Sequence, residues 1–355
     1  MHPVDFLKAL IRIPSVSRNE KPIADYLEAF LKNRNIAVKR YEDNLVFGWG
    51  AGPHTLLLAS HLDTVPPPEN APYPPFEAVE INGRIYGRGS VDAKGCVAAM
   101  TWALLELIEE NYTPPGGRIE VALTVGEEIG GAHNGMAQLA KEHLQPDAAL
   151  IGEPTSLQPC VAQKGLLILK AVTHGTAGHA ARTAGDTAIT KAARDILALQ
   201  QLTFTEADPW VGLPKVTVTE ISASGGSRNV VPSTCTYWLD VRSTPAYPHQ
   251  KLIEHLQSVV TATLHVHSER LVPVHTPVSH PIVQACLKAC PGSKPFGSPT
   301  LSDWVFLANV PAVKIGPGDS EFSHRDDEHI SRDEFMKGIQ VYKRIIQHYF
   351  DMKPS

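Results

Sequence analysis

The chain has 355 residues, of which 43% are hydrophobic and 19% charged, and 32 Lys and Arg against 37 Asp and Glu give a net charge of −5. This composition is ordinary for a folded globular protein and excludes a disordered, collagen-like or coiled-coil chain. The mildly acidic balance has no basic run and argues against a nucleic-acid or anionic-membrane surface, and the length predicts two domains.

Three features of the sequence bear on where the protein works. No window reaches the ~18 apolar residues of a membrane span, and the first residues lack the plan of a signal peptide. The five cysteines are odd in number and scattered, with no CxxC pair, which favours reduced thiols over disulfides or a thiolate zinc site. We therefore expect a cytoplasmic protein.

The outer parts of the chain alternate between helical spacing and short apolar runs. Apolar residues at helical spacing predict helices, and the short runs predict buried strands. The expected elements are a helix around 23–31, strands at 55–60, 119–124, 148–151 and 310–315, and helices at 95–110, 281–290 and 332–350. Such alternation favours an α/β layer with a largely parallel sheet.

The middle of the chain follows a different order, βαββαβ. Its strands are expected at 166–174, 215–222, 235–241 and 264–272, and its helices at 187–202 and 249–261. This order matches the ferredoxin-like unit, so we place an inserted domain at 166–274 and a discontinuous first domain at 1–165 and 275–355. The polar, Thr-rich strand at 215–222 is expected at a sheet edge, where pairing between subunits would bury its open backbone groups.

The residues that can carry chemistry are histidines and acids that follow predicted strands. His61 and Asp63 come after the strand at 55–60; two apart in extended chain, they point the same way, so Asp63 can orient the His61 ring. Asp92 lies in a Gly-rich loop before the helix at 95–110. Each has an ordinary alternative, a surface histidine for His61 and a helix N-cap for Asp92.

Three further motifs follow the same rule. Glu127 and Glu128 come after the strand at 119–124, and adjacent carboxylates face opposite ways, so one can bind a metal while the other moves a proton. Glu153 closes the strand at 148–151, and His324 stands in a charged segment near the C-terminus. A solvated turn, a capping acid and a charged surface loop are the alternatives. The order and placement of all five motifs together favour one site.

The motifs HLDTVP, GRGSVDAKG, GEEIGG, GEPT and SHRDDEHI run in this order over essentially the whole chain. They resemble the M20 family of dinuclear zinc peptidases and deacylases. Within it, segments 175–179, 229–232 and 240–242 look closest to the acetylornithine deacetylase, succinyl-diaminopimelate desuccinylase and acyl-lysine deacylase group, and segments 297–303 and 314–320 resemble the arginine-biosynthetic deacylases in particular. The resemblance implies an α/β, aminopeptidase-like catalytic domain with an inserted ferredoxin-like α+β dimerisation (lid) domain.

The resemblance also implies a metal centre with two Zn²⁺ per subunit, for which Co²⁺ is a plausible substitute. Its five ligands would be His61, Asp92, Glu128, Glu153 and His324. The first ion would bind His61 and Glu153, the second Glu128 and His324, and Asp92 would bridge them. Two Zn²⁺ (+4), three carboxylates (−3) and a bridging hydroxide (−1) sum to zero charge, as suits a catalytic zinc site.

The other implied roles concern catalysis and substrate binding. Asp63 would orient His61, and Glu127 would be the general base and acid. His179 would reach across a homodimer to the oxygen of the scissile carbonyl, and Arg242 and Asn229 would help hold the substrate carboxylate or its surroundings. No ligand or base is missing, which argues against a non-catalytic binding protein.

The expected reaction is hydrolysis of an N-acyl amino acid, first N2-acetyl-L-ornithine to L-ornithine and acetate in arginine biosynthesis. The alternatives are an acetyl- or succinyl-citrulline, an acyl-lysine, succinyl-diaminopimelate, or a di- or carboxypeptidase substrate. Arg325 is expected near the acyl or side-chain pocket. An acidic rim would favour cationic ornithine, unless its members face water; they are Asp319, Glu321, Asp326, Asp327 and Glu328.

Overall fold

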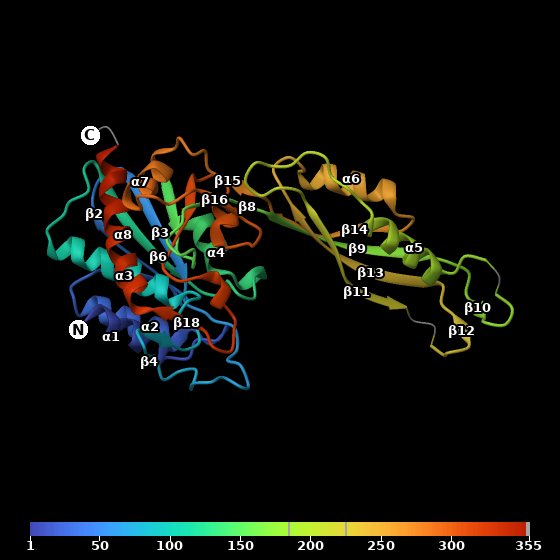
Figure 1. Ribbon diagram of the computed structural model, residues 1–355, viewed down its shortest axis with the longest axis horizontal. Helices are drawn as coiled ribbons and strands as arrows, with labels where there is room; N and C mark the ends of the chain where they lie inside the picture. Colours follow the sequence, from blue (N-terminus) through green and yellow to red (C-terminus); the bar gives the residue numbers. More distant parts are fainter. Residues whose placement is uncertain (184, 224–225, 353–355) are drawn as a thin grey trace. The chain divides into compact units, whose positions relative to one another are not determined.

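The computed structural model describes residues 1–183, 185–223 and 226–352, and the chain divides into two compact units. Unit 1 contains Met1–Val161, His275–Phe296 and the chain from Ser302 onward; unit 2 contains Ala162–Val274 and Gly297–Leu301. The short second segment of unit 2 is held there because the Ser298 carbonyl accepts the Lys164 amide at 3.1 Å. Figure 1 shows both units in sequence colours.

Unit 1 is built on one large sheet with the order β1-β2-β6-β3-β7-β17-β8-β15, and β16 also pairs with β8. The strands are β1 (Val38–Tyr41), β2 (Asn44–Gly50), β3 (His54–His61), β6 (Gly117–Thr124), β7 (Ala148–Ile151), β8 (Cys160–Gln163), β15 (Val274–His275), β16 (Phe296–Ser298) and β17 (Ala312–Lys314). Strands β6, β3, β7 and β17 are parallel, whereas the β1–β2, β2–β6 and β17–β8 pairs are antiparallel. The sheet is therefore mixed, and the expected largely parallel arrangement holds only for its centre.

In the part of unit 1 that the structure describes, six helices accompany this sheet, together with a small sheet in the order β18-β5-β4. The helices are α1 (Pro3–Ile11), α2 (Lys21–Lys32), α3 (Lys94–Glu109), α4 (Gly135–Glu142), α7 (Pro281–Ala289) and α8 (Arg332–Asp351). The small sheet joins β4 (Val79–Ile81) and β5 (Arg84–Tyr86) to β18 (His329–Ser331), and short 3₁₀ turns lie at Gly131–His133, Asp303–Leu307 and Ser320–Phe322. Helix α3 packs against α8 and α1 and is buried along most of its length.

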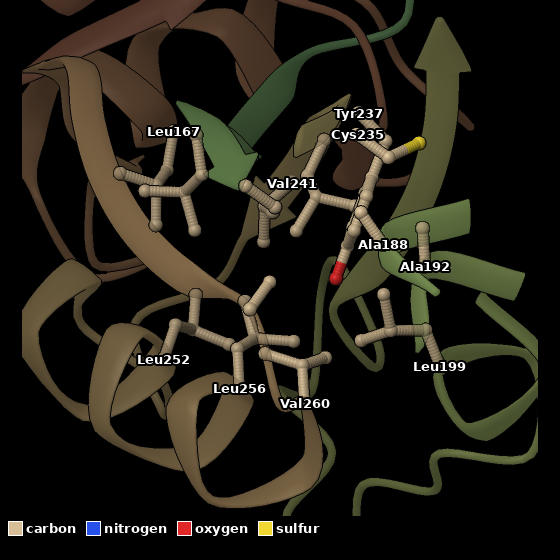
Figure 2. Packing of buried hydrophobic residues seen from close by; sticks show 14 of the residues in the cluster. Leu167, Ala188, Ala192, Leu199, Cys235, Tyr237, Val241, Leu252, Leu256 and Val260 are labelled. Carbon is tan, nitrogen blue, oxygen red and sulfur yellow. The ribbon is translucent and has the colours of Figure 1, made fainter. Parts of the chain in front are cut away.

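Unit 2 is a four-stranded antiparallel sheet in the order β11-β13-β9-β14, covered on one face by two helices. The elements are β9 (Gly165–His174), α5 (Ala188–Gln200), β11 (Lys215–Ala223), β13 (Thr234–Ser243), α6 (His249–Val259) and β14 (Thr263–Leu271). Figure 2 shows Leu252 and Leu256 of α6 packing toward Leu167 and Val241 of the sheet. This is the βαββαβ connectivity of a ferredoxin-like unit, and β11 is the edge strand, as expected for 215–222.

A two-stranded ladder of unit 2 joins β10 (Gly178–His179) to β12 (Val230–Val231). It follows the end of the four-stranded sheet at which His174 pairs with Thr234. In Figure 1 the ladder lies beyond that end of the sheet.

Every helix and strand expected from the sequence is present, with ends that differ by a few residues. Elements that the sequence patterns did not indicate include α1, the β1–β2 hairpin, α4 and the short strands of the small sheets. The five cysteines are free. Across the described residues, none of the helices combines the length and apolar character that crossing a bilayer requires.

Candidate metal centre

The candidate site of unit 1 lies where neighbouring parallel strands end. The pairing of β3 with β6 sets His61 opposite Thr124, and the pairing of β3 with β7 sets Ala59 opposite Ile151. Residues that follow these strands therefore meet at one edge, where open α/β sheets carry their sites. This geometry places His61, Glu127, Glu128 and Glu153 at the same edge of the sheet.

Two histidines face the two oxygens of one carboxylate. His61 Nε2 lies 3.1 Å from Asp92 Oδ1, and His324 Nε2 lies 3.4 Å from Asp92 Oδ2. On the His61 side, Nε2 is also 3.9 Å from Glu153 Oε1; on the His324 side, Nε2 is 3.1 Å from Glu128 Oε1. Asp92 thus lies between two imidazole–carboxylate pairs, His61 with Glu153 and His324 with Glu128.

The structure excludes the alternative interpretations of His61 as a surface histidine and of Asp92 as a helix N-cap. His61 is 1% exposed, so it is no surface histidine. Asp92 does not cap α3, because the N-cap position is Ala93 and no side chain makes a capping hydrogen bond there. The side chain of Asp92 is left to face the two histidines.

Asp63 connects His61 to the turn that carries Glu127 and Glu128. The ring nitrogen Nδ1 of His61 lies 3.0 Å from the Asp63 carbonyl oxygen and 3.5 Å from its Oδ1. The Asp63 carboxylate also accepts the backbone amides of Glu127 and Glu128, each at 3.1 Å, and the Ser17 hydroxyl at 2.8 Å. The contact to His61 has the pattern that orients metal-binding histidines, and the carboxylate also fixes the Glu127–Glu128 turn.

The pKa values of His61, His324 and Asp92 differ strongly from their usual values. Burial opposes charge on His61, but hydrogen bonds to Asp63 and Asp92 outweigh it and raise its pKa well above the usual value. Hydrogen bonds to Asp92 and Glu128 raise the pKa of His324 to about 10. Despite burial, the same two histidines hold the pKa of Asp92 well below its usual range.

The pKa values of two neighbouring acids are raised, in contrast to that of Asp92. Burial, reinforced by the charge of Asp92, raises the pKa of Glu153 to about 8. Burial also raises the pKa of Glu127 well above its usual value. Imidazoles that attract protons beside acids that resist ionisation indicate a cluster short of positive charge, which a divalent cation would supply while displacing protons from its ligands.

The donor chemistry fits a metal. His61, Asp92 and Glu128 each offer a ligand atom, and these atoms lie within 4.8 Å of one another. Imidazole nitrogen and carboxylate oxygen without thiolate suit Zn²⁺ and similar divalent ions. His61 is buried, whereas the His324 side chain is 50% exposed, so the arrangement has a closed side and an open side.

Sequence reasoning missed three buried residues beside the site. Glu328 is 4% exposed and pairs with Arg88, so it belongs to no acidic rim. Asp303 accepts from the Thr124 hydroxyl at 2.9 Å and from Asn134 at 2.7 Å, and burial raises its pKa to about 6. In the sequence, Arg88 stands between two glycines, Glu328 is one of several acids in the late motif, and Asp303 ends the segment 297–303. None of these patterns predicts which residue would be the partner.

The late loop contributes in another way. Arg325 pairs with Asp327 at 2.9 Å and lies over the Phe322 ring. It lines a small pocket together with Arg88 and with prolines and Tyr73 of the 66–75 segment. The Pro-rich segment therefore forms a wall beside the loop that carries His324.

The three predicted residues of unit 2 do not all lie together within that unit. His179 pairs with Val230, and the Asn229 carbonyl accepts the amide of Ala180 at 2.9 Å, so His179 and Asn229 are neighbours. Arg242 stands eight residues along β13 from Thr234, roughly 27 Å at the usual rise. Its guanidinium makes two hydrogen bonds to Asp240, at 2.8 and 3.1 Å.

The family model of peptidases M20/M25/M40 matches residues 57–348. The chain belongs to this family. It is accordingly a hydrolytic enzyme that acts on amide bonds, in a family of metal-dependent enzymes.

Curated relatives cover nearly the whole chain at modest identity. A succinyl-diaminopimelate desuccinylase of Ruegeria sp. (strain TM1040) is 26% identical over 98% of this chain and 95% of its own length. An acetylornithine deacetylase of Edwardsiella ictaluri is 29% identical over 96% of each. A probable carboxypeptidase of Aspergillus flavus is 29% identical over 97% of this chain and 89% of its own length.

Solved structures share the fold. Aminopeptidase PepT from Bacillus cereus matches with a TM-score of 0.80 at 20% identity, over 98% of both chains. The Bacillus subtilis YXEP protein, described as a dinuclear metal binding peptidase of the M20 family, matches with a TM-score of 0.77 at 16% identity, over 99% of this chain and 98% of its own.

Proposed function

We propose that the protein is a metal-dependent deacylase that hydrolyses N2-acetyl-L-ornithine to L-ornithine and acetate, as a step of arginine biosynthesis in the cytoplasm. The observation that carries the hydrolytic part is Asp92, whose two carboxylate oxygens each face a histidine Nε2, at 3.1 and 3.4 Å. The relative named acetylornithine deacetylase supports the substrate, and the free cysteines suit a reducing compartment.

The metal centre we propose holds two Zn²⁺ per subunit, or Co²⁺ in their place. His61 and Glu153 would hold one ion, Glu128 and His324 would hold the other, and Asp92 would contribute to both. The distances on each side of Asp92 support this division, since each histidine has its own carboxylate partner. When bound, the ions supply Lewis-acid activation of the amide carbonyl and of water.

The chain's own residues perform the proton transfers. Glu127 accepts a proton from the attacking water and passes it to the leaving amine, the work of one positioned general base and acid. Asp63 holds the Glu127 amide and faces the His61 ring, so one carboxylate sets the places of base and ligand.

Substrate recognition is assigned to unit 2, and a homodimer completes the site. His179 would donate to the carbonyl oxygen of the substrate in the partner's site, while Asn229 and Arg242 would help hold the substrate carboxylate or its surroundings. The exposed position of His179 on the β10–β12 ladder supports its availability. Strand β11 is exposed at the sheet edge, and edge pairing with a second copy would satisfy its backbone groups.

A second candidate is a carboxypeptidase or dipeptidase with the same centre, favoured by the relative named a probable carboxypeptidase. Other acyl amino acids, namely acyl-citrulline, acyl-lysine and succinyl-diaminopimelate, are alternatives within the first class.

One kinetic comparison separates these candidates. The Zn²⁺-loaded enzyme is assayed on the acetyl and succinyl forms of ornithine, citrulline, lysine and diaminopimelate, and on a set of dipeptides. We expect the highest kcat/KM on acetylornithine. A higher value on any dipeptide would replace the deacylase assignment with the peptidase one.

A further inference from the structure

Arg88 and Glu328 form a buried ion pair between segments 240 residues apart. Each side chain is 3% exposed. A buried ion pair of this kind contributes little net stability, because removing two charges from water costs about as much free energy as their attraction returns. The surroundings of the pair indicate another role.

The Glu328 carboxylate divides its two oxygens between the ion pair and the Asp92 loop. Oε2 accepts from Arg88, while Oε1 accepts the backbone amides of Val91 and Asp92, at 3.1 and 3.2 Å. The acceptor therefore fixes the backbone of the residue whose side chain stands between the two histidines. Arg88 compensates the charge that this acceptor carries.

Glu328 also belongs to the segment that carries the second histidine. It lies four residues after His324, and its carbonyl accepts the Gly87 amide at 3.1 Å. The next residue begins β18, which pairs with β5 so that His329 is opposite Tyr86. One residue thus joins the His324 segment to the loop of Asp92 through both its backbone and its side chain.

We propose that Glu328, with Arg88, is a positioning residue that sets the open half of the metal centre, made by His324, Asp92 and Glu128. It acts through the Asp92 backbone and the His324 segment and touches no metal ion. The inference rests on the proposed metal-dependent function. It predicts that the divalent ion on the His324 side depends on Glu328 more than the ion on the buried His61 side.

Three variants separate position from charge. Glu328→Ala removes the acceptor, and Glu328→Gln keeps an acceptor oxygen but leaves Arg88 charged without its partner. The double variant Arg88→Met with Glu328→Gln keeps the acceptor and removes both charges. The control is Glu106→Gln: Glu106 of α3 pairs with Lys343 of α8 at 2.9 Å, so this variant also removes the acid of an ion pair between distant segments, but at a pair that contacts none of the proposed ligands.

The measurement is titration of the metal-free chain with Co²⁺, followed by visible absorption and by calorimetry, with no substrate present. In the wild type we expect two binding steps. The first belongs to the ion on the buried His61 side, and the second to the ion on the open His324 side. Glu328→Ala should weaken the second step by about 10–100-fold, the usual cost of losing a partner that supports a ligand. The first step should stay within about threefold, and the double variant should restore the second step and its Co²⁺ spectrum.

The inference would be overturned if Glu328→Ala bound Co²⁺ in two steps with wild-type affinities. It would also be overturned if Glu106→Gln weakened the second step as much as Glu328→Ala does. If Glu328→Ala does not fold by circular dichroism, the comparison of Glu328→Gln with the double variant decides: a folded double variant that still lacks the second step overturns it. A wild-type chain that binds no Co²⁺ would instead overturn the proposed metal-dependent function, and this inference with it.

Discussion

The carboxylate of Asp63 accepts the backbone amide of Glu127 at 3.1 Å, so the residue that faces the His61 ring also holds the proposed base in place. Sequence spacing assigned Asp63 only the first of these roles. The second role makes Asp63 a link between binding a metal and moving a proton.

We expect Asp63→Asn to lower both metal affinity and kcat. The amide has one acceptor oxygen, so one of the Glu127 and Glu128 amides would lose its partner, at about 1–3 kcal/mol for a buried donor. A 10–100-fold drop in metal affinity is the usual size of such a loss beside a ligand. Calorimetric titration together with steady-state kinetics measures both, and a variant that loses neither would limit Asp63 to a packing role.

Glu127→Gln should remove most of the activity while the metal content stays the same. The amide side chain fills the same space but cannot take a proton from water or give one to the leaving amine. General acid–base catalysis contributes about 10²–10⁴-fold. Turnover and metal analysis of one preparation test this, and near-normal turnover would exclude Glu127 as the base.

Chelation should abolish activity, and Zn²⁺ or Co²⁺ should restore it. The metal-free chain should remain folded, because a protein of about 350 residues buries enough apolar surface without a metal. Circular dichroism of the chelated protein, taken beside the activity assay, distinguishes loss of metal from loss of fold. Full activity with no metal detected would contradict the metal-dependent mechanism.

Subunit complementation tests the role of His179 in the proposed dimer. His179→Ala should lose about 10²–10³-fold in turnover for the missing donor, and Glu127→Ala about 10²–10⁴-fold for the missing base. After subunit exchange, a mixed dimer should regain one site built from Glu127 of one chain and His179 of the other. Mixtures that stay inactive despite proven exchange, or a fully active monomer, would exclude a donor from the partner.

A pH-dependent loss of stability should arise in unit 2 from His249. The ring is 8% exposed, with Nε2 2.8 Å from Ser243 Oγ and Nδ1 3.0 Å from the Glu269 carbonyl, and burial lowers its pKa. Below about pH 6.5 the unfolded chain binds the proton more readily than the folded one. The free energy of unfolding should therefore fall as pH decreases through that value toward the lower folded pKa, by at most about 1.4 kcal/mol per unit.

The matched variant for this effect is His249→Gln, which cannot titrate. Urea unfolding of the wild type and of the variant is measured between pH 7.5 and 5. The difference between their free energies of unfolding should shrink as the pH falls. Parallel pH profiles would assign the effect to other groups.

Local patterns predicted most of the elements because buried strands and amphipathic helices leave their period in the sequence. They did not indicate β2, in which Gly48 interrupts the apolar run. An added Cβ at Gly48 would lie 2.2 Å from the Ile119 carbonyl oxygen, so close approach to β6 requires glycine there. Such a requirement depends on the neighbouring strand and is invisible in β2 alone.

The candidate site shows the same division. The placing of His61, Glu127 and Glu153 at one edge of the sheet could be predicted because each lies at, or within three residues of, the end of a recognisable strand. The Arg88–Glu328 pair could not, because its partners are 240 residues apart and each alone is typical of an exposed charged loop. Long-range pairing of charges needs the fold before it can be recognised.

Unit 2 interrupts unit 1, and that interruption affects the order of events during synthesis. Glu153 and His324 are 171 residues apart, and both segments of unit 2 lie between them. At about 5–20 residues per second, a ribosome needs roughly 9–34 s to pass from one to the other. A nascent chain therefore carries four of the proposed ligands well before the fifth, so the complete centre can form only after His324 has left the ribosome.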